Sequence, residues 1–138
     1  VYHDVDEGIL TEFHPWMDSV YFRADEKLLE LSHRAADRLR MEGDIWWGRM
    51  ATGEAFVSDE ARKAINEKYS PLSVDMETAA IAHVCYVNRK PFIAVRCITD
   101  NADHDGAQCF ERNCEKASAI AKDVTLAMLS ELAGMAQC

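Results

Sequence analysis

The feature that most limits the fold of this chain is an apolar run near its middle. Residues 91–99 have the sequence PFIAVRCIT, which is apolar on both alternating faces except at Arg96. Successive side chains of a β-strand point to opposite faces, so the run predicts a strand, Phe92–Thr99, that is covered on both sides. Such strands are typical of parallel sheets flanked by helices, and the run therefore favours an α/β fold.

The segments around this run alternate between extended and helical patterns. LSVDM (Leu72–Met76) predicts a short strand, and ETAAIAHVCYVNR after it predicts a helix that is apolar nearly all round. An amphipathic helix is expected from Asp25 until Gly43, and Ser58 is expected to cap another. A closing helix is indicated by residues at spacings of three and four, namely Phe110, Cys114, Ala117, Ala121, Val124 and Met128. This alternation predicts one α/β domain with a largely parallel sheet.

The N-terminal part has weaker patterns. Val1–Val5 is interpreted as the end of a strand, and residues 44–57 as an extended stretch. Residues 7–23 show no clear period and contain Pro15, so a long loop is predicted there. The chain opens on Val1 in the middle of a motif-like sequence, which suggests a piece of a longer protein.

Charge and cysteine content exclude some classes of partner. The 138 residues carry 24 acidic and 15 basic side chains, a formal net charge of −9, which argues against nucleic acids and anionic membrane surfaces. No apolar run reaches membrane-spanning length. The five cysteines form no CxxC pair, so free thiols and a cytoplasmic location are expected.

Two acids occupy positions where the predicted elements meet. Glu77 stands where a helix starts and Asp100 where a strand stops. If both strands are parallel, their carboxyl ends share one sheet edge, where ligands of open α/β sheets bind. Either acid is also explained as a helix-cap or turn residue, and the pattern alone leaves both interpretations open.

The expected surroundings of the two acids differ. A helix N-terminus favours the ionised form of Glu77, whose two oxygens can accept hydrogen bonds from neighbouring hydroxyls such as those of a ribose. Burial at the end of a strand favours the protonated form of Asp100, which would then have a proton to donate. One fixed acceptor and one proton donor suit cleavage of a bond between a sugar and a base.

Several ordered motifs resemble the nucleoside phosphorylase/hydrolase superfamily. They are YHDVD (Tyr2–Asp6), TGEAFV (Thr52–Val57), VDMETAAIAHVCYVNRKPFIAVRCITDNAD and the following Phe110. Within the superfamily the chain most resembles the nucleosidases of 5′-methylthioadenosine and S-adenosylhomocysteine. The resemblance implies a single α/β domain with a mixed, largely parallel central sheet flanked by helices. Residues 1–138 would be its C-terminal portion, with the N-terminal half absent.

The resemblance also implies an activity and its setting. These enzymes hydrolyse the N-glycosidic bond of their substrate and release adenine and a thioribose, a step of methionine salvage. The implied partner is a small purine nucleoside, bound without a cofactor. A homodimer is expected for the full-length protein, in the cytoplasm.

The motifs assign roles to individual residues by the same resemblance. Asp100 matches the acid that engages the purine at N7 and assists its departure, and Thr99 stands beside it where serine is frequent. Glu77 matches the carboxylate that holds the ribose hydroxyls, and Met76 packs along the sugar. The remaining matches line the ligand: Phe56 stacks on adenine, the backbone of Val57 contacts the base edge, and Phe110 lies on the ribose and alkylthio side.

The departures from the family pattern leave alternatives open. The glycine-rich segment and the glutamate that activates water match nothing in this chain, so the isolated 138-residue polypeptide is expected to be inactive. A purine nucleoside phosphorylase fits the same residues. A non-enzymatic interpretation is a degenerate adenosine-binding or assembly module.

Two groups of acidic and histidine residues invite a metal interpretation. One is Asp100, Asp103, His104 and Asp105, and the other is His3, Asp4 and Asp6. Neither group has a recognised ligand spacing, so no metal site is expected. His83, between apolar neighbours on a predicted helix, is interpreted as a core or interface histidine rather than a base.

Overall fold

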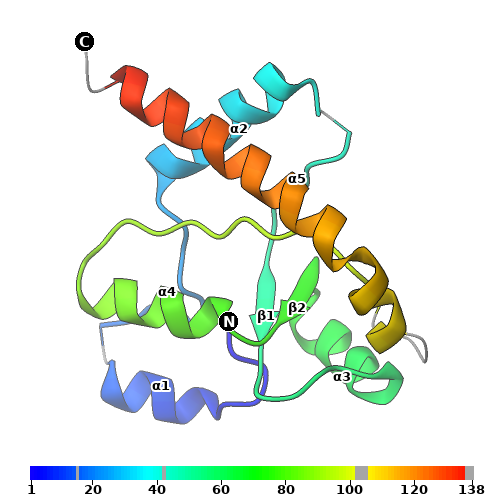
Figure 1. Ribbon diagram of the computed structural model, residues 1–138. Helices are drawn as coiled ribbons and strands as arrows, with labels where there is room; N and C mark the ends of the chain where they lie inside the picture. The colour runs from blue at the N-terminus through cyan, green and yellow to red at the C-terminus, as the bar shows by residue number, and fades with distance from the viewer. Residues whose placement is uncertain (15, 42, 102–105, 136–138) are drawn as a thin grey trace. The chain divides into compact units, whose positions relative to one another are not determined.

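The computed structural model describes residues 1–14, 16–41, 43–101 and 106–135, and the chain divides into two compact units (Figure 1). Unit 1 combines Val1–Arg23 with Gly48–Phe92 and contains α1 (Glu7–Phe13), β1 (Met50–Thr52), α3 (Asp59–Tyr69), β2 (Ser73–Asp75) and α4 (Thr78–Val87). Unit 2 combines Ala24–Trp47 with Ile93–Cys138 and contains α2 (Glu26–Leu39) and α5 (Gly106–Met135). That the chain is a portion of one larger domain stays a prediction.

A short parallel sheet forms the centre of unit 1. β1 and β2 pair in parallel, with Met50 opposite Ser73 and Thr52 opposite Asp75. Tyr2 adds an isolated parallel bridge to Thr52, so the N-terminal segment runs alongside β1. The α/β class and the parallel pairing are therefore confirmed, and β2 lies inside the predicted strand Leu72–Met76.

The first helix was not expected from the sequence. The prediction of a loop over residues 7–23 is wrong for Glu7–Phe13, which forms α1. Asp6 provides the cap, because its Oδ1 accepts a hydrogen bond from the Gly8 backbone N–H at 2.7 Å. The helix ends before Pro15, and proline disfavours a helical conformation of the residue before it. Seven residues are too few to show a clear hydrophobic period.

The predicted helix after the DMET motif is confirmed as α4. Thr78, Ala79 and Ala82 are its buried residues, and these small side chains face β1. Ile81, Val84 and Val87 are exposed, so α4 carries apolar side chains on its exposed face as well as on its buried face. In Figure 1 α4 and α3 are drawn on either side of the two strands.

The predicted strand Phe92–Thr99 is not a strand in this structure. Residues 91–101 carry no strand assignment, and the described residues of unit 2 contain no other strand with which they could pair. A strand exists only with a neighbour to share its hydrogen bonds, and the apolar pattern of one segment cannot supply that neighbour. Ile93 and Val95 pack against the core of unit 2, whereas Ile98 is 59% exposed.

Unit 2 is built on the packing of α2 against α5. The buried core consists of Ala35 from α2 with Val124, Ala127 and Met128 from α5. The predicted helix from Asp25 is confirmed at its start, where Asp25 Oδ1 accepts from the Leu28 N–H at 3.1 Å. It ends earlier than Gly43, because Arg40 adopts a left-handed conformation with φ 55° and forms the C-cap.

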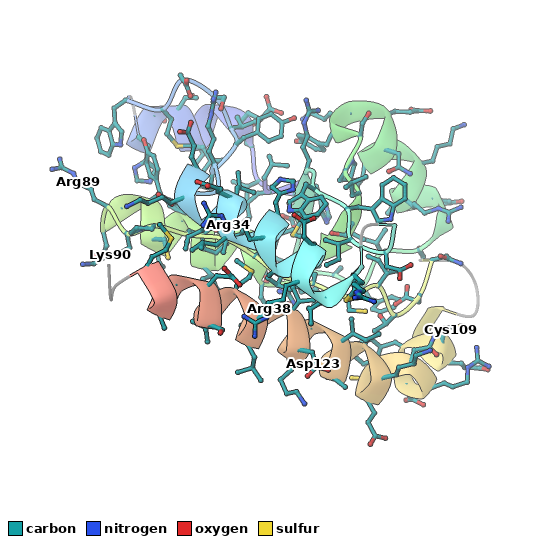
Figure 2. The ribbon with its side chains drawn as sticks, turned by 90° about the horizontal axis from the view of Figure 1, so that it is seen from above. Arg34, Arg38, Arg89, Lys90, Cys109 and Asp123 are labelled. Carbon is teal, nitrogen blue, oxygen red and sulfur yellow. The ribbon has the colours of Figure 1, made fainter. Side chains whose placement is uncertain are left out.

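The closing helix is confirmed as α5, but only part of its predicted face is buried. Ala117, Val124 and Met128 are buried, whereas Phe110 is 44% exposed. Arg38 projects from α2 toward α5 (Figure 2), and its Nη1 donates to Ser130 Oγ at 3.1 Å. None of the described helices has the length and apolar content needed to cross a membrane.

A cluster of aromatic rings surrounds His83 in unit 1. Phe22 stacks on the His83 ring with centroids 4.9 Å apart, and Tyr2 and Tyr86 complete the cluster. His14, at the end of α1, brings its Nε2 within 2.6 Å of His83 Nε2. Burial lowers the pKa of His83, and the neighbouring His14 lowers it further. His83 thus packs in an aromatic cluster with a lowered pKa, and its interpretation as a core or interface histidine rather than a base stays a prediction.

Acidification is expected to destabilise the protein through His83. Because the folded-state pKa of His83 lies below its ordinary value of 6.5, the unfolded chain binds more protons as the pH falls through that value. The free energy of unfolding should therefore decrease from about pH 7.5 to about pH 5.5, a range that brackets the pKa of an ordinary histidine. Urea denaturation at both pH values measures this decrease.

Two variants test whether charge is the cause. His83→Gln cannot gain the proton, so it should show a smaller pH dependence than the unmodified chain. Phe22→Leu removes a ring packed on His83 without removing a titrating group, and should lower stability similarly at both pH values. An unchanged pH dependence in His83→Gln would contradict the assignment.

Candidate functional site

The carboxyl ends of β1 and β2 form the candidate site of unit 1. The two strands are in register to their last residues, and the Gly53 N–H donates to the Asp75 carbonyl at 3.1 Å. The turns that follow the strands therefore leave from one edge of the sheet, the edge where ligands of parallel α/β sheets bind. The first turn leads to Phe56 and Val57, and the second contains Met76 and Glu77.

The turn after β1 is anchored by the N-terminal segment. Asp4 Oδ2 accepts a hydrogen bond from the Glu54 backbone N–H at 2.5 Å, and the His3 N–H donates to the Thr52 carbonyl at 2.9 Å. Val57 is buried, whereas Phe56 is 53% exposed. An exposed ring on an anchored turn can stack on a flat ligand.

The turn after β2 is capped by Asp75 and not by Glu77. Asp75 Oδ1 accepts from the backbone N–H groups of Glu77 and Thr78, at 3.1 and 2.9 Å. Glu77 occupies the N-cap position of α4, but its side chain forms no capping hydrogen bond and the residue is exposed. The helix-cap interpretation of Glu77 therefore does not describe what its carboxylate does.

Asp75 was missed by the sequence analysis, although a signal for it exists. An aspartate three residues before Thr78, the first residue of a helix, stands at a spacing typical of backbone capping. Burial acts to raise the pKa of Asp75, but hydrogen bonds from Thr78 and Thr52 outweigh it, and the pKa is lowered overall. The carboxylate is therefore held in its ionised form.

A second group of predicted residues lies together in unit 2. Thr99 Oγ1 donates to Asp100 Oδ2 at 2.9 Å, and Asp100 is half-buried. Asn113 of α5, which the sequence analysis missed, donates from its Nδ2 to the Thr99 carbonyl at 2.8 Å. Phe110 lies one turn before Asn113 on the same helix. That Asp100 and Glu77 act on one ligand stays a prediction.

The described residues offer no obvious place for a metal ion. Within residues 1–14, 16–41, 43–101 and 106–135 no group of three or more histidine, cysteine, aspartate or glutamate residues is arranged to hold one. Asp103, His104 and Asp105 of the DNADHD segment lie outside the described residues.

Comparison with known proteins identifies the family. Residues 1–130 match the phosphorylase superfamily. The chain belongs to this superfamily. It is 33% identical over 137 residues to the 5′-methylthioadenosine/S-adenosylhomocysteine nucleosidase of Bacillus pumilus, a match that covers 94% of this chain and 58% of the relative.

Solved structures of the superfamily share the fold. The S-adenosylhomocysteine nucleosidase of Streptococcus pyogenes, in complex with 5-methylthiotubericidin, has a TM-score of 0.80 and 30% identity, with 96% of this chain and 57% of that chain covered. The futalosine hydrolase of Helicobacter pylori has a TM-score of 0.80 and 29% identity, with 95% and 57% covered. The chain thus spans less than two thirds of these relatives. The narrower expectation that it is only their C-terminal half is not supported by these matches.

Replacement of Gly53 by alanine is expected to disturb the anchored turn. A Cβ at this position would overlap His3 Nε2 and lie 2.8 Å from Asp4 Oδ2, the atom that accepts from Glu54. Overpacking of this kind costs about 1–3 kcal/mol, which chemical denaturation measures.

Gly43→Ala is the matched control, because a Cβ there would meet no atom within 4 Å. It should leave the free energy of unfolding close to that of the unmodified chain. Equal losses in the two variants would show that the close approach of His3 to Gly53 is unimportant.

Proposed function

We propose that the protein hydrolyses the N-glycosidic bond of 5′-methylthioadenosine or S-adenosylhomocysteine to give adenine and a thioribose. In this proposal the chain supplies purine- and ribose-binding residues. The observation that carries the proposal is the shared sheet edge of unit 1, from which the turns with Phe56 and Glu77 both leave, in a member of the phosphorylase superfamily. The nucleosidase names of the relatives from Bacillus pumilus and Streptococcus pyogenes support the same reaction.

Glu77 is proposed to hold the ribose. Its exposed carboxylate follows directly on the capped turn, and two carboxylate oxygens can accept hydrogen bonds from two neighbouring hydroxyls. Departure of the base leaves positive charge on the sugar, in an oxocarbenium-like transition state. An ionised Glu77 stabilises that charge, and Met76 before it, 47% exposed, offers an apolar surface to the sugar.

Asp100 is proposed to assist the departure of adenine. Donation of a hydrogen bond or proton to N7 of the purine makes the base a better leaving group. Thr99 supports this role because its hydroxyl and its carbonyl link Asp100 to α5 through Asn113.

Three further residues are proposed to line the ligand. The exposed ring of Phe56 would stack on adenine, a contact worth about 1–3 kcal/mol where bases stack on aromatic side chains. The backbone of Val57 would contact the base edge. Phe110, partly exposed on α5, would line the ribose and alkylthio side.

Location and assembly are part of the same proposal. Cys85, Cys97, Cys109 and Cys114 are free thiols, which supports a reducing compartment such as the cytoplasm. A homodimer is proposed for the complete protein, and light scattering coupled to size exclusion would measure its mass.

Adenine release distinguishes hydrolysis from phosphorolysis. The complete gene product should release adenine from 5′-methylthioadenosine at the same rate with and without phosphate, because water is the proposed acceptor. A rate that depends on phosphate would identify a purine nucleoside phosphorylase instead. Binding of the nucleoside without release by the complete product would favour a non-enzymatic adenosine-binding module. Futalosine should be assayed in parallel, because one of the structural relatives is a futalosine hydrolase.

Substitution of the two acids tests their separate roles. Asp100→Asn should lower kcat by ~10²–10⁴-fold, the usual contribution of a positioned acid. Glu77→Gln should lower kcat/KM by an amount equivalent to about 1.5–3 kcal/mol, the value of hydrogen bonds to a charged group. Steady-state kinetics of the complete gene product measures both.

Glu115→Gln, which removes an exposed acid from α5, is the control for loss of charge and should leave kcat/KM unchanged. Full activity in Asp100→Asn would contradict the proposed role of that acid.

A further inference from the structure

A hydrogen-bonded pair links the end of β1 to the start of α4. Thr52, the last residue of β1, donates from Oγ1 to Asp75 Oδ1 at 2.7 Å. The same Thr52 oxygen accepts from the buried Ala79 N–H at 2.9 Å. Asp75, the last residue of β2, uses the same Oδ1 for the N–H groups of Glu77 and Thr78. Two side chains thus hold three successive backbone N–H groups at the beginning of α4.

We propose that Asp75 and Thr52 are positioning residues that fix the backbone of Glu77 and thereby aim its carboxylate at the ribose of the substrate. The inference rests on the proposed function, because it assigns to Glu77 the ribose that the function requires. Neither residue is proposed to touch the substrate.

The geometry of the turn explains why Glu77 needs this support. Its backbone, with φ −135° and ψ −31°, lies outside the helical conformation of α4, so the helix does not determine its orientation. Bonds to the N–H groups of residues 77, 78 and 79 fix the peptide planes on the C-terminal side of the turn. The pairing of β1 with β2 fixes the other side.

Burial strengthens the hydrogen bond between Thr52 and the Ala79 N–H. Thr52 is 3% exposed and Ala79 is 2% exposed, so their hydrogen bond is shielded from water. A buried backbone N–H that loses its acceptor costs about 1–3 kcal/mol, so the turn has no equally stable arrangement without Thr52. A displacement of roughly 1 Å in a positioned group can reduce catalytic efficiency ~10²-fold, and small shifts of this turn would therefore matter.

Two ligands separate positioning from general stability. Adenine contacts only the base-binding residues, whereas 5′-methylthioadenosine also presents ribose hydroxyls to Glu77. The Kd for adenine divided by the Kd for 5′-methylthioadenosine, both measured by titration calorimetry on the 138-residue chain, reports the contribution of the sugar. A loss of folded protein would weaken both ligands alike and leave the ratio unchanged.

Asp75→Ala and Thr52→Val should reduce this ratio by roughly 10- to 100-fold while adenine affinity stays within about twofold. Neither change removes the hydrogen bonds by which the N-terminal segment anchors the turn with Phe56 and Val57. Asp75→Asn and Thr52→Ser keep an oxygen acceptor at each position and should preserve the ratio, as aspartate and asparagine cap helices about equally well. Glu77→Gln is the positive control for loss of the sugar contribution.

Ser58→Ala is the matched control, because Ser58 occupies the N-cap position of α3 without a side-chain capping bond and should preserve the ratio. If Asp75→Ala and Thr52→Val both leave the ratio unchanged, or weaken the binding of adenine and of the nucleoside equally, the positioning proposal is overturned. If Asp75→Ala does not fold, the comparison of Thr52→Val with Thr52→Ser decides alone. No preference for the nucleoside over adenine in the unmodified chain would also overturn the positioning proposal, whereas failure of the complete gene product to release adenine would refute the proposed function.

Discussion

The parallel pairing of β1 with β2 is the constraint on which the candidate site of unit 1 depends. All three residues of β1 pair with the three residues of β2. The Val1 segment adds a third parallel stretch, because the Thr52 N–H donates to the Val1 carbonyl at 2.8 Å. The N-terminal amine of Val1 donates to the Met50 carbonyl at 3.0 Å. Because all three segments run in one direction, the turns after β1 and β2 leave from the same edge. An antiparallel pairing would place Phe56 and Glu77 at opposite ends of the strands.

The ionised carboxylate of Asp75 connects the paired strands to α4, the helix that follows. A half-buried carboxylate is unfavourable unless its oxygens accept hydrogen bonds, and Asp75 Oδ1 accepts from Thr52 across the sheet and from two backbone N–H groups ahead of α4. The same bonds that stabilise the charge therefore join strand, turn and helix. Small residues of α4 complete the connection, because Ala79 and Ala82 allow the helix to lie close to β1.

The sequence predicted those parts of the fold whose cause is local. β2, α4 and the start of α2 follow from short-range patterns and a capping aspartate at position 25. The strand Phe92–Thr99 was predicted wrongly because a strand depends on a partner that lies elsewhere in the chain. The helix α1 was missed because its signal is one cap, Asp6, and too few residues for a period. In the site, Glu77 was singled out by its place at the start of a predicted helix, whereas its role and the choice of Phe56 came from resemblance to a family. Asp75 was missed although its spacing from Thr78 was a local signal, whereas Asn113 was missed because its role is a contact to the backbone of another segment.

The contact between Thr99 and Asp100 bears on the role that is proposed for Asp100. A hydroxyl group can donate one hydrogen bond and also accept, so Thr99 Oγ1 can donate to the ionised carboxylate or accept from the protonated one. The 2.9 Å contact is therefore compatible with the hydrogen-bond donation to the purine that is proposed for Asp100. The carbonyl of Thr99 accepts separately from Asn113, so the Thr99 backbone is held independently of its hydroxyl group. A valine at position 99 would keep the shape but would offer neither hydrogen bond, so the hydroxyl group itself is the feature that this role requires.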